Sequence, residues 1–353
     1  MEIIMLNLNK KEWGEFAIND LFNVSGTITT HPSKLISEGC IPRITCSSTN
    51  NGLENTYANM ATENGGVLTV DSATVGFISY QEADFIATDH VEKIFNTKRI
   101  NRNLGLALVV SIKTATLNKF NYGYKFSQWR IKRQKILLPI NEANKPDYKY
   151  MEDYTKSIID KKIEKYKIYT NSTLNSIKYK EIEKLEDKEW KEFFLTDIFS
   201  KIQRGKRLIT SNQQVGNKPY VSSTSLNNGI DNFISNQESV RLFSDCLSIA
   251  NSGSVGASFY HPYEFVASDH ITHLKKEGMS KFVYLFISTL TNGLSKKYNF
   301  NREINDKRIS REKILLPVND QEQPDYEYME QYMKNLMYKK IKQYLEYIEK
   351  QSS

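Results

Sequence analysis

The sequence predicts an α+β protein in which two tandem domains of mixed helix and strand are each followed by a long helix. Three observations predict it. The chain repeats itself with a period of about 178 residues, each copy holds short apolar runs separated by turn residues, and each copy ends in a segment with helical spacing. A chain of 353 residues is also longer than one hydrophobic core usually serves. We therefore expect two domains related by pseudo-twofold symmetry.

The repeat fixes the order of the elements. Residues 11–16 (Lys-Glu-Trp-Gly-Glu-Phe) return at 188–193 as Lys-Glu-Trp-Lys-Glu-Phe, and both copies close on Lys-Ile-Leu-Leu-Pro, at 135–139 and 313–317. Between these blocks the copies diverge, with residues 23–46 and 91–130 resembling 200–221 and 271–308 poorly. A period of this length indicates a duplicated domain with its connector, because solenoid repeats are only 20–50 residues long.

Each copy opens with apolar residues that predict a short strand or a turn of helix entering a core, at 16–24 and 194–202. Apolar runs at 67–70, 77–80, 247–250 and 257–260 then predict strands, since Asn-Gly, Gly-Gly and Ser-Gly turns separate them. Helical stretches are expected at 104–117 and 281–294. Each globule should therefore contain both helices and strands.

After Pro146 and again after Pro324 the apolar residues follow helical spacing, as far as Leu185 and Ile348. Neither segment contains Gly or Pro past its first turn, and each apolar stripe is narrow. Two such helices are expected to pack as an antiparallel coiled coil, the alternative being that each packs only on its own domain. The expected division is a first globular domain at 1–145, a central helical spacer at 146–187, a second globular domain at 188–323 and a C-terminal helical spacer at 324–353.

Composition limits the class of protein. The formal net charge of +7 suits binding to a polyanion, but it would equally suit an ordinary basic protein. Three cysteines without a paired pattern indicate neither a disulfide framework nor a zinc site. The first nine residues lack a leader pattern, and no apolar stretch reaches 18 residues, so we expect a cytoplasmic protein without a membrane segment.

The usual catalytic motifs are missing from the sequence. It has neither the glycine-rich cofactor loop and Pro-Pro-Tyr or Pro-Pro-Phe motif of a DNA methyltransferase nor a Walker loop. Asp147 with Glu186, Asp187 and Lys188 matches a nuclease pattern only weakly. His270 and His273 lack a third ligand, and the repeated Asp-His pairs at 89–90 and 269–270 suit a structural contact. We therefore expect no enzymatic activity, no cofactor and no metal.

Binding residues remain. Cations in the divergent early part of each copy can pair with phosphates, and Arg can also bond guanine. Later in each copy basic and aromatic residues interleave, as nucleic-acid grooves require, although a solvated basic face would look the same. The repeated Ser-Ser-Thr blocks offer small donors, and the Asn-Asn-Gly blocks behind them favour a turn. The candidates in copy one are Lys34, Arg43, Ser47, Ser48, Thr49, Lys119, Tyr122, Lys125, Arg130 and Arg133, and those in copy two are Arg204, Lys206, Arg207, Ser222, Ser223, Thr224, Lys296, Lys297, Tyr298, Arg302, Arg308 and Arg311.

The order globule, helix, globule, helix resembles the DNA-specificity subunits of type I restriction-modification systems. The opening block, the run at 252–256 leading to Asp269-His270, and the Ile-Leu-Leu-Pro block at 136–139 carry the resemblance, which spans Lys11 to Lys350. Leu-Leu-Pro followed by Asn and Pro-Asp-Tyr-x-Tyr-Met-Glu is closer to the type IIB arrangement. Copy one departs from the pattern at residues 71–74, Asp-Ser-Ala-Thr, where copy two has Asn-Ser-Gly-Ser at 251–254.

The resemblance implies a non-catalytic subunit that recognises a bipartite double-stranded DNA target. It also implies recruitment of two DNA methyltransferase subunits, with or without a nuclease subunit. A stand-alone sequence-specific DNA-binding regulator with a duplicated domain is the alternative, because the missing catalytic motifs suit it equally well. A third class, an enzyme on an unfamiliar scaffold, would turn over nucleic acid as the purified chain alone.

Overall fold

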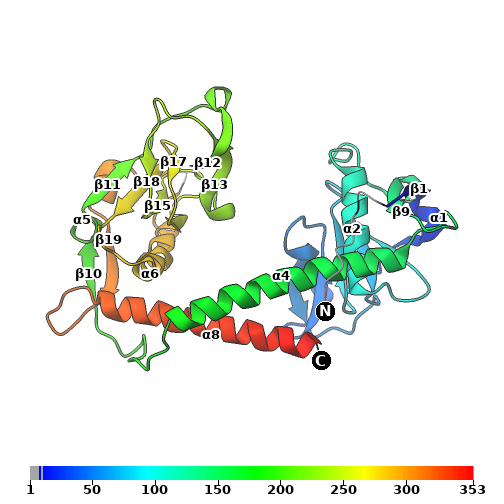
Figure 1. Cartoon of the computed structure of the whole chain (residues 1–353), viewed down its shortest axis with the longest axis horizontal. Helices are drawn as coiled ribbons and strands as arrows, with labels where there is room; N and C mark the ends of the chain where they lie inside the picture. The colour runs from blue at the N-terminus through cyan, green and yellow to red at the C-terminus, as the bar shows by residue number, and fades with distance from the viewer. Residues whose placement is uncertain (1–7, 9–10, 300, 353) are drawn as a thin grey trace. The chain divides into compact units, whose positions relative to one another are not determined.

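A computed structural model describes residues 8, 11–299 and 301–352 of the chain (Figure 1). The N-terminal segment in which the sequence shows no leader pattern lies outside these residues, except for Leu8. The chain divides into two compact units, residues 1–166 and 167–353. Apart from one additional short strand, β14, in unit 2, each unit contains helices and strands in the same order, so the fold class predicted from the repeat is confirmed.

Unit 1 is built on a four-stranded antiparallel sheet in the order β2-β8-β5-β6. Val67–Asp71 is buried along its whole length, because this strand lies in the middle of the sheet. A three-stranded sheet, β4-β3-β7, and the antiparallel pair β1-β9 complete the strands. Their bounds are β1 Trp13–Ala17, β2 Asn23–Gly26, β3 Ile41–Ile44, β4 Leu53–Tyr57, β5 Val67–Asp71, β6 Ile78–Gln81, β7 Ile86–Ala87, β8 Val91–Phe95 and β9 Lys135–Pro139.

Unit 2 repeats these pairings. Its antiparallel sheet has the order β11-β18-β15-β16, its second sheet the order β13-β12-β17-β14, and its terminal pair is β10-β19. The pairs β1-β9 and β10-β19 keep one register, with Trp13 opposite Pro139 and Trp190 opposite Pro317. The bounds are β10 Trp190–Phe194, β11 Lys201–Arg204, β12 Val215–Val221, β13 Ile230–Ile234, β14 Leu242–Phe243, β15 Cys246–Ala250, β16 Ser258–His261, β17 Phe265–Ala267, β18 Ile271–Lys275 and β19 Lys313–Pro317.

One helix in each unit packs on the four-stranded sheet and closes the main core. It is α2 (Arg102–Thr116) in unit 1 and α6 (Lys281–Thr291) in unit 2, as the sequence predicts. Each begins at a capping side chain, since Asn101 accepts the Leu104 amide and Ser280 accepts the Val283 amide. Shorter helices are α1 Ile18–Leu21, α3 Gln128–Arg133, α5 Leu195–Ile198 and α7 Asp306–Ile309.

The two long helices are α4 (Tyr148–Ser176), drawn green in Figure 1, and α8 (Tyr326–Ser352), drawn red. In its first turn α4 contributes Met151 to the core of unit 1. At its other end Leu174, with Ile177 just beyond the helix, packs on Met337, Ile341 and Leu345 of α8. Pairing of the long helices is therefore confirmed over the last turns of α4.

The prediction that helix continues to Leu185 is wrong, because α4 ends at Ser176. Ser172, Thr173 and Ser176 bond their hydroxyls to carbonyls three or four residues back, which competes with helical geometry. Residues 177–187 then run without helix along α8, where Asn335 bonds both the amide and the carbonyl of Lys180. Lys178 contacts Gln331 and Lys188 contacts Asp325, so this segment and α8 are antiparallel.

Candidate nucleic-acid interface

Each unit carries a basic segment between its sheet-packing helix and its Lys-Ile-Leu-Leu-Pro strand. We call residues 117–134 the first basic loop and residues 295–312 the second basic loop. The Asn121 side chain accepts the amides of Gly123 and Tyr124 at 2.9 and 3.0 Å, and Asn299 accepts those of Asn301 and Arg302 at 3.0 and 3.1 Å. An Asn side chain thus closes the same turn in both units. Residue n of the first loop therefore corresponds to residue n + 178 of the second.

The first basic loop brings its predicted cations and aromatic rings together. The Arg130 guanidinium lies 3.9 Å from the Tyr124 ring centroid, that of Arg133 lies 5.2 Å from Trp129, and Lys125 Nζ lies 5.3 Å from Tyr122. Tyr122 and Trp129 are 79% and 67% exposed. An open groove of about 600 Å³ lies here, lined by Lys119, Phe120, Tyr124, Trp129, Arg130, Arg133 and Gln134. Cations and aromatic faces in one open groove suit a nucleic-acid backbone with its bases.

The second basic loop uses its predicted residues differently. Tyr298 is buried and donates its hydroxyl to Glu312, and Lys297 Nζ lies 2.7 Å from the same carboxylate. Burial, reinforced by the Glu312 hydrogen bond, raises the pKa of Tyr298 to about 12. Tyr298 therefore offers no ring face to a ligand, and the Arg302 guanidinium lies 5.4 Å from the centroid of its ring. Exposed cations remain at Lys296, Arg302, Arg308 and Arg311.

The Ser-Ser-Thr and Asn-Asn-Gly blocks form one turn in each unit. Asn51 and Asn228 have φ of 56° and 55°, in the left-handed region that Asn tolerates, so the predicted turn is confirmed. The Ser47 hydroxyl accepts the Thr49 amide at 3.2 Å, and Thr224 accepts the Leu226 amide at 3.1 Å. Ser48, Ser222 and Ser223 are exposed or half-buried in the same turns.

Arg43 and Lys34, the two early candidates of unit 1, differ in whether a ligand can reach them. Arg43 is 5% exposed and pairs with Glu54, so its guanidinium is engaged inside the fold. Lys34 is exposed at the end of a short 3₁₀ turn. Arg43 is therefore better explained as a structural cation than as a contact with DNA, whereas Lys34 can reach a ligand.

The early cations of unit 2 lie at the end of strand β11 and in the loop directly after it. Arg204 is half-buried, and its carbonyl accepts the Arg241 guanidinium at 2.5 Å. Lys206 and Arg207 are exposed, and the Lys206 amide bonds the Ala267 carbonyl at 3.0 Å. The backbone is therefore held while the two exposed side chains stay available.

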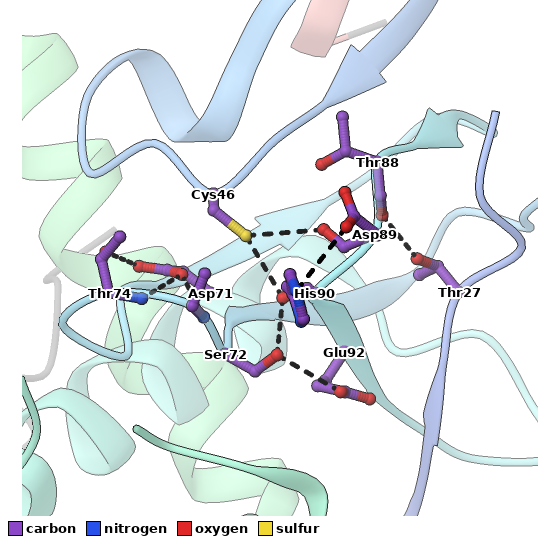
Figure 2. Close-up of polar contacts among 10 residues, drawn as sticks. Thr27, Cys46, Asp71, Ser72, Thr74, Thr88, Asp89, His90 and Glu92 are labelled. Atoms are coloured by element: carbon purple, nitrogen blue, oxygen red, sulfur yellow. Dashed lines mark hydrogen bonds and ion pairs between the residues drawn. The ribbon is translucent and has the colours of Figure 1, made fainter. Parts of the chain in front are cut away.

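The Asp-His pair of unit 1 lies in a polar cluster with Cys46, Asp71 and Ser72 (Figure 2). The Cys46 thiol contacts the His90 carbonyl at 3.2 Å, and the Ser72 hydroxyl bonds that carbonyl at 2.7 Å. Burial, followed by the charge of Asp71, raises the pKa of Cys46 to about 12, so the thiol stays protonated and is no nucleophile near neutral pH. The cluster is structural.

The same cluster resolves the turn at residues 71–74. Asp71 accepts the amides of Ala73 and Thr74 at 2.8 and 3.0 Å as well as the Thr74 hydroxyl (Figure 2). In unit 2 the corresponding Asn251 instead accepts the Thr272 hydroxyl at 2.9 Å, and His270 bonds Ser252. Copy one therefore stabilises its turn with a buried carboxylate, whereas copy two has Gly253 there, with φ of 61°.

Three residues that shape the basic loops were not predicted. Tyr124 and Gln134 line the first groove, and Glu312 holds Lys297 in the second. The sequence signal that could have found them is the offset of 178 between the copies, which makes Gln134 and Glu312 equivalent positions. Among the described residues no group of three or more His, Cys, Asp or Glu side chains could hold a metal ion. No helix in that part of the chain is long and apolar enough to cross a membrane.

Known proteins resemble this chain in sequence and in fold. The sequence pattern of the type I restriction modification DNA specificity domain matches the chain twice, over residues 10–168 and 187–347. The specificity subunit S.BcgI of a type II restriction enzyme from Heyndrickxia coagulans is 32% identical over 333 residues, 92% of this chain and 94% of that protein. The crystal structure of a type I restriction-modification S subunit from M. genitalium covers 98% of this chain and 95% of that one, with a TM-score of 0.53 and 15% identity. At that identity the structural match concerns the fold alone.

Proposed function

The chain belongs to the type I restriction modification DNA specificity family, and from this membership we propose that its two units each recognise one half of a bipartite double-stranded DNA target. A specificity subunit selects the sequence on which a restriction-modification complex acts. The proposed target-recognition domains are residues 1–145 and 188–323, with spacers at 146–187 and 324–353.

The duplicated basic loop carries this proposal. Each unit holds an equivalent loop, closed by the same Asn turn, with exposed cations around it. Phosphate contacts position a protein on the duplex, while side chains in divergent segments distinguish bases. Because the two loops occupy equivalent positions in their units but differ in sequence, the two halves of the target should differ in sequence.

The chemistry is proposed to come from other subunits. The sequence holds no methyltransferase motif, so we propose a non-catalytic chain that recruits two DNA methyltransferase subunits, with or without a nuclease subunit. The complex would act on DNA in the cytoplasm. The resemblance of the Pro-Asp-Tyr-x-Tyr-Met-Glu blocks to the type IIB arrangement favours partners in which methyltransferase and nuclease are fused.

Fluorescence anisotropy with a labelled duplex of random sequence tests the binding part of the proposal. Arg130→Ala with Arg133→Ala should weaken binding, because both guanidinium groups line the open groove. Lys149→Ala is the matched control, since Lys149 is an exposed cation on α4 that pairs with Asp153. Equal affinity for the wild type and both variants would count against a DNA-binding role for the first basic loop.

Co-purification tests the recruitment. Expression of the tagged chain in its own cells should yield methyltransferase subunits, and the isolated complex should methylate DNA when S-adenosylmethionine is added. The chain alone should neither bind S-adenosylmethionine nor methylate DNA. Tight, sequence-specific binding by the chain alone, without any co-purifying methyltransferase, would favour a stand-alone regulator instead.

A further inference from the structure

The two basic loops differ in the charges they contain. The first loop, residues 117–134, holds five cations and no acidic residue, whereas the second, residues 295–312, holds six cations and three acidic residues. At the equivalent of Gln134 the second loop has Glu312. One amide-to-carboxylate difference thus lies at the base of the groove.

Glu312 neutralises part of the second loop. Its carboxylate is 4% exposed and accepts both Lys297 Nζ, at 2.7 and 3.0 Å, and the Tyr298 hydroxyl. A buried carboxylate needs such partners, so Lys297 is not free to leave it for a phosphate at low cost. Lys297 and Tyr298 therefore stabilise the fold of the second basic loop and are not available to a ligand.

In the first loop the residues equivalent to Lys297 and Glu312 do not pair with each other. Lys119 lies at the position of Lys297, and Gln134 donates its amide to the Lys135 carbonyl. Within the described residues no carboxylate pairs with Lys119, Arg130 or Arg133. All three cations line the groove, so their charges remain available to an anionic ligand.

The aromatic rings orient the two guanidinium groups. Arg130 also donates to the Lys125 carbonyl at 2.7 Å while it lies over Tyr124, which fixes its plane. Stacked guanidinium groups keep their N–H edges free for bidentate bonds to phosphate, and less conformational entropy is lost on binding when the side chain is already held. The second loop has Arg302 and Lys307 where the first has Tyr124 and Trp129, so it lacks these two supporting rings.

We propose that the first basic loop is the main phosphate anchor of the chain, through Lys119, Arg130 and Arg133, and that the residue at position 134 or 312 sets how strongly each unit holds the nucleic-acid backbone. This inference rests on the proposed function, because it assumes that the ligand is DNA. The two units then contribute unequally: unit 1 supplies more of the sequence-independent affinity.

The salt dependence of DNA binding tests the inference. The logarithm of the binding constant falls with the logarithm of salt concentration by about 0.9 per neutralised phosphate. Gln134→Glu should pair with Lys119 as Glu312 pairs with Lys297, lowering that slope by about 1 and the affinity by about tenfold at 0.1 M salt. Glu312→Gln should release Lys297 and leave the slope equal or steeper, never shallower.

Gln134→Ala is the matched control, because it removes the amide without adding charge and should keep the wild-type slope. Thermal unfolding followed by circular dichroism checks that each variant is folded. If Glu312→Gln does not fold, the comparison of Gln134→Glu with Gln134→Ala decides the test. Equal slopes for Gln134→Glu and Gln134→Ala, with the wild type binding DNA, would overturn the inference alone. Failure of the wild type to bind duplex at low salt would overturn the proposed function and the inference with it.

Discussion

A buried histidine should make unit 2 sensitive to mild acid, and unit 1 offers the control. His261 on β16 is 0% exposed, with Nε2 2.8 Å from the Ser248 hydroxyl and its ring 4.5 Å from that of Phe265. Burial lowers the pKa of His261 to about 4 from an ordinary value of 6.5. At the equivalent place unit 1 has Gln81, whose amide bonds the Thr69 hydroxyl at 3.0 Å, and Gln does not titrate.

The sign follows from where the proton binds. Between pH 6.5 and 4 the unfolded chain takes up a proton at this histidine and the folded chain does not, so acid favours unfolding. Above pH 6.5 both states are neutral and the effect vanishes. The two pKa values correspond to a loss of about 2 kcal/mol of unfolding free energy at pH 5, approaching 3 kcal/mol near pH 4.

Hydrogen–deuterium exchange resolves the two units in one sample. From pH 7.5 to 5.0, after correction for the intrinsic exchange rate, protection of β15 and β16 should fall about 30-fold in the wild type, which corresponds to about 2 kcal/mol. Strands β5 and β6 serve as the internal reference. His261→Gln should make the fall about 30-fold smaller than in the wild type, because His273, whose pKa burial also lowers, acts equally in both proteins. A fall of the same size in His261→Gln would refute the reasoning.

Three further predictions concern packing and thiol reactivity. Phe286→Ala should cost about 3–5 kcal/mol of unfolding free energy in urea denaturation, since this buried ring lies between Trp190 and Tyr332; a cost below about 1 kcal/mol would contradict that packing. Asn335→Ala should cost about 2 kcal/mol and speed proteolysis within residues 177–187, because the Lys180 amide and carbonyl lose their partner; an unchanged cleavage rate would show that Asn335 does not hold the segment. At pH 8 a thiol reagent should modify exposed Cys40 quickly and Cys46 and Cys246 slowly, since burial raises the pKa of both to about 12; Cys40→Ser should remove the fast phase, and a remaining fast phase would count against the assignment.

The repeat made most of the architecture predictable from the sequence. The helical stretches expected at 104–117 and 281–294 correspond to α2 and α6, and the Asn-Asn-Gly blocks predicted their turns, because these signals are local. The course of residues 177–187 after α4 was not predictable in this way, since it depends on Asn335, which lies 155 residues from the backbone it bonds.

The candidate site was predictable only in part. Interleaved cations and rings identified both basic loops, yet Arg43 and Tyr298 face inward toward Glu54 and Glu312. Residue type does not reveal direction: an Arg on a strand points to either face, and its partner is fixed by pairing β3 with β4. A comparison of the two copies position by position would have indicated Glu312, because the acid occurs in one copy only.

Two units that each recognise one half of a DNA target should together select a divided sequence. Selection of bound sites from a randomised duplex library, by the chain with the subunits that co-purify with it, tests this most directly. We expect two short motifs separated by a spacer of fixed length and free sequence, and Lys206→Ala with Arg207→Ala should relax only one of them, because these exposed cations belong to unit 2. A single continuous motif, or equal loss of both halves in the variant, would contradict the account.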